Sequence, residues 1–84
     1  MATQFQPLAD RKILRRIQVE AWTGLSRSTI YAKIQAGTFP APIALGGRAV
    51  GWDSRAIEQW IDERVAAGEA EWRARRSDAS QRQG

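Results

Sequence analysis

Residues 23–37, with the sequence TGLSRSTIYAKIQAG, decide the fold. Gly24 supplies the backbone freedom that ends one helix, and Ser26 is a favourable N-cap for the next, so these residues predict a tight helix-to-helix turn. The helix after the turn is expected over about residues 27–36 and ends at a glycine. Ile30 and Ile34, four residues apart, mark its buried side, and its other faces are polar.

A shorter helix is expected before this turn, over about residues 17–23. Val19, Trp22 and Leu25 could form one buried stripe on it, although Trp22 stands where a smaller aliphatic residue is expected and should be partly exposed. Residues 12–16 read as a short, extended lead-in.

The hydrophobic period changes to two in residues 41–52, APIALGGRAVGW. Apolar residues alternate on both sides of a Gly-Gly pair, and glycines supply the positive φ angles that hairpin turns need. The sequence therefore predicts a β-hairpin. Its alternating residues are Ile43, Leu45, Val50 and Trp52.

A third helix is capped by Asp53 or Ser54 and should bury one face, formed by Ile57, Trp60, Ile61 and Val65. Gly68 should weaken this helix, although residues 70–76 could resume it.

The chain is thus expected to comprise a flexible leader (1–10), a folded domain (11–68) and a polar tail (69–84), partly helical or disordered, with disorder expected from residue 77 onward.

The composition argues against an enzyme. The 84 residues include no Cys and no His, so thiolate and imidazole chemistry and disulfides are absent, and no cofactor, metal or small-molecule substrate is expected. The first ten residues lack an apolar run of the length that a signal peptide or membrane span needs, which favours the cytoplasm.

The net charge of +4 is concentrated in residues 1–52, whereas residues 53–67 carry four acidic and two basic side chains. A polyanion is therefore the first partner to consider, with the third helix turned away from it.

Two short helices, a Gly-tipped hairpin and a packing helix follow each other in the order of a winged helix-turn-helix module. We therefore expect a mainly α domain with a small β-hairpin. The same pattern also fits a protein-interaction adaptor that presents a basic helix face and an exposed Trp.

Five consecutive segments of the sequence resemble a known family. The chain is similar to the AlpA-like prophage regulators and excisionases, whose domain resembles the DNA-binding end of the MerR group. The segments are residues 13–16 (ILRR), 23–31 (TGLSRSTIY), 37–43 (GTFPAPI), 45–52 (LGGRAVGW) and 57–61 (IEQWI).

The resemblance implies a double-stranded DNA partner, with the second helix in the major groove, the hairpin as a wing, and adjacent copies bound side by side. It also implies a bacterial host, with the protein at the nucleoid, and two roles: transcriptional control, with RNA polymerase as a partner, or excision as the directionality factor of a tyrosine-type integrase. The candidate DNA-binding residues of the second helix are Arg27, Ser28, Thr29, Tyr31, Ala32, Lys33 and Gln35.

Two positions leave alternatives open on that helix. Tyr31 is as consistent with the edge of the core as with a phosphate contact. Family members often carry a basic residue where this chain has Ala32, so a base contact at that position could move to Lys33.

The hairpin and the lead-in add further candidates. Gly46, Gly47 and Arg48 form the expected wing tip, where a guanidinium could enter a minor groove or bind a phosphate. Arg15 and Arg16 fit phosphate contact and surface solvation equally well.

The tryptophans divide by environment. Trp52 and Trp60 are in phase with apolar neighbours and are assigned to the core. Trp72 stands in a polar stretch, which fits a contact with a second copy or a loose helix end.

Overall fold

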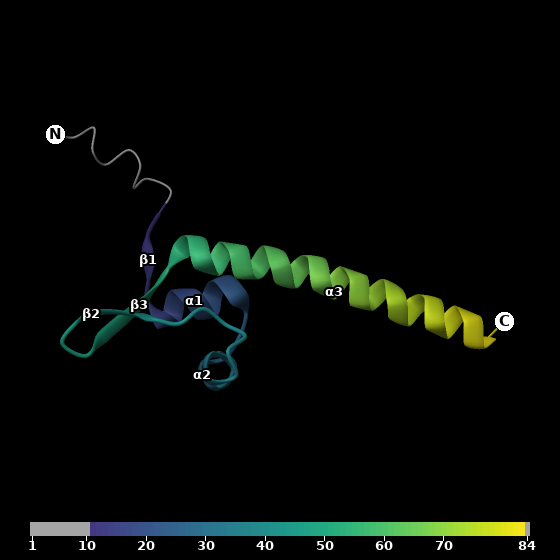
Figure 1. Cartoon of the computed structure of the whole chain (residues 1–84), viewed down its shortest axis with the longest axis horizontal. Helices are drawn as coiled ribbons and strands as arrows, with labels where there is room; N and C mark the ends of the chain where they lie inside the picture. The colour runs from purple at the N-terminus through teal and green to yellow at the C-terminus, as the bar shows by residue number, and fades with distance from the viewer. Residues whose placement is uncertain (1–10, 84) are drawn as a thin grey trace.

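A computed structural model describes residues 11–83, with side chains described through Arg76. The leader and Gly84 lie outside the described residues. The described chain is mainly helical with a small antiparallel sheet (Figure 1), which confirms the expected fold class at that level. The elements are β1 (Ile13–Leu14), α1 (Arg16–Thr23), α2 (Arg27–Gln35), β2 (Ile43–Gly46), β3 (Ala49–Asp53) and α3 (Ser54–Gln83).

The sheet has three strands in the order β1-β3-β2, with both pairings antiparallel. The β2–β3 hairpin was expected, but the pairing of β1 with β3 was not. β1 is short, yet Ser54 holds it in place: the Lys12 N–H donates to Ser54 Oγ and the Ser54 N–H donates to the Lys12 carbonyl, both at 2.8 Å. The lead-in is thereby fixed to the start of α3.

The turn between α1 and α2 has the expected caps. Gly24 adopts a φ of 75°, and its N–H donates to the Glu20 carbonyl at 2.7 Å, which ends α1. Ser26 caps α2 by accepting a hydrogen bond from the Thr29 N–H at 3.3 Å.

The core forms where α1, α2, the sheet and the start of α3 meet. Trp52 is fully buried at its centre, as predicted, whereas Trp60 is half-buried and packs against it. Five further apolar side chains are buried with Trp52: Leu14, Val19, Ile30, Phe39 and Ile57.

Several large apolar side chains lie outside the core. Ile43 and Leu45 of β2 are each 41% exposed. Trp22 (42% exposed) lies at the end of α1, where its partial exposure was expected, but Val65 (53% exposed) was predicted to be buried. That prediction is wrong because α3 leaves the domain at this point.

The third helix is longer than predicted. It continues past Gly68 to Gln83, so residues 70–76, which the sequence allowed to resume the helix, belong to one uninterrupted helix. Figure 1 shows its second half extending well beyond the two short helices. Within residues 11–83, no helix combines the length and the apolar content needed to cross a bilayer.

Candidate nucleic-acid interface

The polar side of α2 is open to solvent along its length. Arg27, Ser28, Ala32 and Gln35 are exposed, and Thr29 and Lys33 are half-buried. A duplex approaching α2 from this side would therefore meet these side chains first.

Tyr31 lies at the edge of the core and is also partly exposed to solvent. Its ring packs edge-on against Trp52, with the centroids 6.5 Å apart, so one side belongs to the edge of the core. The side chain is nevertheless 37% exposed, and the Arg27 guanidinium lies 5.9 Å from the ring centroid. The aromatic ring thus supports the Arg27 cation on the α2 surface through a cation–π contact.

The first turn of α2 contains a small hydroxyl network. Ser26 Oγ accepts from the Thr29 N–H and lies 3.0 Å from Thr29 Oγ1, to which it donates, and it also lies 3.5 Å from Ser28 Oγ. Ser26 is therefore engaged in capping, as expected. The Thr29 hydroxyl thus already accepts a hydrogen bond from Ser26. Among the described residues, Ser28 Oγ makes only the 3.5 Å contact with Ser26 Oγ.

The hairpin tip presents Arg48. Gly46 and Gly47 have φ angles of 116° and 56°, which allow the tight reversal between β2 and β3 and leave Arg48 exposed directly after it. The pairing register of β2 with β3 shifts between Ala44 and Gly46, so the ladder is irregular next to the tip.

One hollow joins three separate parts of the chain. We call it the basic hollow; its volume is about 290 Å³, and it is lined by Arg15, Arg16, Ile17, Tyr31, Arg48 and Val50. The lead-in, α2 and the hairpin therefore share one surface rather than pointing apart.

Charge in the basic hollow is partly compensated. Arg16 forms an ion pair with Glu20 one helical turn along α1, so its guanidinium is already engaged by a carboxylate. Arg15 and Arg48 are exposed, and Arg16 is half-buried. The exposed arginines at positions 15 and 48 are thus better suited than Arg16 to an incoming anion.

A second hollow, of about 440 Å³, lies along α2 and is lined by Ser28, Thr29, Ala32, Lys33, Ala36 and Thr38. Of the candidate residues of α2, Tyr31 lines the basic hollow, four line the second hollow, and Arg27 and Gln35 line neither. Of residues 54–76 of α3, whose side chains the structure describes, none lines either hollow.

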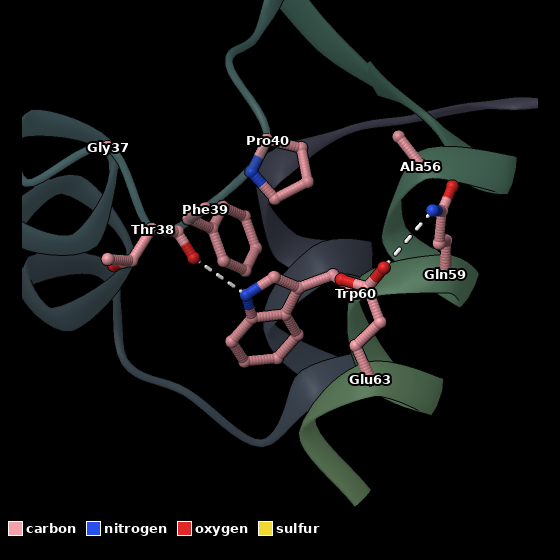
Figure 2. Close-up of a pocket in the computed structure, with 8 residues that line it drawn as sticks. All are labelled: Gly37, Thr38, Phe39, Pro40, Ala56, Gln59, Trp60 and Glu63. Carbon is pink, nitrogen blue, oxygen red and sulfur yellow. Dashed lines mark hydrogen bonds between the residues drawn. The ribbon is translucent and has the colours of Figure 1, made fainter. Parts of the chain in front are cut away.

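Two tryptophans fix the position of α2 through the linker that follows it. Trp60 Nε1 donates to the Thr38 carbonyl at 2.8 Å, and its ring packs edge-on against Phe39 at 4.8 Å between centroids (Figure 2). Trp52 Nε1 donates to the Pro40 carbonyl at 3.1 Å. Sequence reasoning placed both tryptophans by their apolar phase alone and missed these indole hydrogen bonds. The signal that could have found them is that an indole N–H assigned to a core needs an acceptor.

Asp53, at the end of β3, connects Arg11, before β1, with the first turn of α3. It accepts a hydrogen bond from Arg11 at 2.9 Å and another from the Arg55 N–H at 3.0 Å, and the Arg11 contact contributes most to holding the pKa of this carboxyl below its ordinary value. Among the described residues, no three acidic side chains gather closely enough to bind a metal ion, and the sequence contains no Cys or His.

Comparisons with known proteins identify the family. The model of the family described as "Prophage CP4-57 regulatory protein (AlpA)" matches residues 12–65. The chain is 40% identical over 67 residues to "Uncharacterized protein ORF88" of Enterobacteria phage P4, covering 76% of each chain. It is 36% identical over 59 residues to "DNA-binding transcriptional activator AlpA" of Escherichia coli (strain K12), covering 63% of this chain and 84% of the relative. No solved structure matches the chain. The family model spans every element from β1 to the first part of α3, and the chain therefore belongs to the AlpA family of prophage regulatory proteins.

Proposed function

We propose that this protein is a sequence-specific DNA-binding regulator of a mobile genetic element, with α2 as the recognition helix and the β2–β3 hairpin as the wing of a MerR-like winged helix-turn-helix. Its family and the printed name of the relative from Escherichia coli support this proposal. The basic hollow carries it, because Tyr31 of α2, Arg48 of the hairpin and Arg15 before α1 line one concavity.

The proposed mode of binding follows from this arrangement. The polar side of α2, beginning at Arg27 and Ser28, lies in the major groove with its first turn towards the base edges. Arg48 reaches the adjacent minor groove or phosphate row, and Arg15 contacts the backbone. Arg16 contributes less than the sequence alone implies, because Glu20 already neutralises it.

A module of this size binds weakly by itself. One helix and one wing bury roughly 600–1,000 Å² of protein surface on DNA, so adjacent copies on repeated sites would add affinity through effective concentration. We therefore include cooperative binding in the proposal.

The biological role follows from the family's origin in prophages. We propose transcriptional control, service as an excisionase for a tyrosine-type integrase, or both, with RNA polymerase or the integrase as protein partner. The protein acts without catalysis, at the nucleoid in the cytoplasm of its bacterial host.

A salt titration tests DNA binding. Duplexes selected from a random library and scrambled versions of them are titrated with the full chain while anisotropy is recorded. The proposal expects log affinity to fall linearly with log salt and to stay at least about a thousandfold tighter for the selected duplex. Weak binding that does not distinguish the two duplexes would instead identify the adaptor.

The variant Arg48→Ala tests the wing. It should lower the affinity for DNA. It should also make the slope of log affinity against log salt shallower by about 0.9, the value for one phosphate contact. Arg73→Ala, which removes an equal charge from the far half of α3, is the matched control and should leave both quantities unchanged. Equal effects of the two variants would exclude a specific role for the hairpin tip.

A footprint on the DNA around the gene and its attachment site separates the two roles. Protection beside a promoter supports regulation, and phased protection inside the attachment site supports excision. Protection at neither place would exclude both roles.

A further inference from the structure

The projecting half of α3 carries an apolar stripe that the proposed DNA contacts do not use. Ile61, Val65, Gly68 and Trp72 recur at intervals of four, three and four residues, which places them on one side of the helix. Val65 is 53% and Trp72 59% exposed. Two large apolar groups are therefore presented to solvent on a helix that already extends beyond its domain.

A hollow of about 240 Å³ lies at the inner end of this stripe, between the end of α1 and α3. Its apolar lining comes from Trp22, Leu25, Trp60, Ile61 and Val65. Trp72 cannot fill the hollow of its own chain, because it stands two helical turns, about 10 Å, further along the same helix than Val65.

We propose that two copies of this chain pair through antiparallel α3 helices, and that the Trp72 side chain of each copy fills the hollow lined by Trp22, Leu25 and Ile61 of the other. The arrangement is two-fold symmetric, so the contact forms twice. It does not depend on DNA, and the surface lies on a part of the molecule that contributes nothing to the basic hollow.

The helix geometry supports this register. Placing Trp72 of one copy opposite residues 61–65 of the other puts the symmetry axis at about residues 66–68, which are Ala66, Ala67 and Gly68. Of these three, Gly68 lies on the side of the stripe, where a small residue lets two helices approach closely, and a Cβ built on it meets nothing within 4 Å in its own chain. The space at the axis is therefore open to a second helix.

The charges of α3 favour the antiparallel direction. Residues 53–67 contain four acidic and two basic side chains, whereas residues 73–76 contain three arginines and no acid. Antiparallel pairing brings Arg75 and Arg76 of one copy alongside Glu58 and Asp62 of the other, while parallel pairing places like charges together. Arg64 and Glu71, an ion pair within one chain at 3.3 Å, would also meet across the axis.

Sedimentation equilibrium of the full chain without DNA tests the pairing. The chain should be monomeric at micromolar and dimeric at millimolar concentration. Trp72→Glu should raise the Kd of the dimer by at least about a hundredfold, because both copies lose a buried ring and gain a charge. Ala70→Glu, on the opposite side of the helix, is the matched control and should change the Kd by less than about threefold. A chain that stays monomeric, or two variants of equal effect, would overturn the proposal.

Oxidative cross-linking tests whether the two α3 helices pair antiparallel. The sequence contains no Cys, so each introduced Cys is the only thiol in its chain. Gly68→Cys, at the axis, should form a disulfide-linked dimer. Arg76→Cys should not, since its two copies would lie about 25 Å apart in the antiparallel arrangement, far beyond disulfide reach. Cross-linking of both variants would establish parallel pairing and overturn the proposal. Because no DNA is present, these results are independent of the DNA-binding proposal.

Discussion

Replacing Trp52 by Phe tests whether the indole at the centre of the core holds the domain together. Its side chain is fully buried, its Nε1 donates to the Pro40 carbonyl at 3.1 Å, and its ring supports Tyr31 of α2. Besides the indole nitrogen, the smaller ring lacks two buried carbon atoms, worth roughly 2 kcal/mol at ~0.8 kcal/mol each. The lost hydrogen bond adds about 1 kcal/mol, because Pro40 is only half-buried and water can reach part of it.

The expected loss is therefore about 3 kcal/mol in the free energy of unfolding, equivalent to a fall of roughly 12–24 °C in Tm for a domain of this size. Urea and thermal melts followed by circular dichroism in dilute solution measure it. Trp72→Phe, the same substitution at an exposed position, should change stability by less than about 0.5 kcal/mol. A loss below about 1 kcal/mol for Trp52→Phe, or an equal loss for the two variants, would refute the assignment of Trp52 as the centre of the core.

Two further perturbations test how β1 is held. Gly51→Ala should cost about 1–3 kcal/mol, because a Cβ there would clash with Ile13 Cγ2 and lie 3.1 Å from the Leu14 carbonyl oxygen. Gly68→Ala, where a Cβ has open space, should instead raise the melting temperature slightly; similar melts for the two variants would contradict this reasoning. The pKa of Asp53 is lowered in the folded chain, so its contribution to stability is present above the ordinary value of 3.8 and is lost as the pH falls through the lower folded value. Urea midpoints at a series of acidic pH values should therefore fall less steeply for Asp53→Asn than for the unmodified chain, and parallel curves would exclude the carboxylate.

Local signals predicted much of the fold. Gly24 and Ser26 marked the turn between α1 and α2, and the Gly-Gly pair marked the hairpin, because caps and tight turns depend on residues adjacent in sequence. The fully buried Trp52 was also recognised from its alternation with its neighbours.

Features that depend on distant contacts were missed. A two-residue strand such as β1 has no readable period of its own, and its pairing depends on Ser54, forty-two residues away from Lys12. The burial of Val65 was predicted wrongly because periodicity identifies a helix face but not where the neighbouring elements end. Gly68 did not break α3, since a single glycine costs a helix only about 1 kcal/mol and strong helix formers flank it.

The exposure of the candidate residues could be predicted from the sequence, but their arrangement could not. The exposed positions on α2 and at the hairpin tip followed from the phase of the apolar residues around them. The engagement of Arg16 by Glu20, and the meeting of Arg15, Tyr31 and Arg48 in one hollow, required coordinates.

We propose that α2 and the hairpin tip bind one duplex at the same time. Hydroxyl-radical footprinting of a selected duplex can compare the unmodified chain with Arg48→Ala. The unmodified chain should protect one major-groove segment and its flank, and Arg48→Ala should lose the flank while keeping the segment. Identical footprints for the two proteins, or no protection by either, would contradict it.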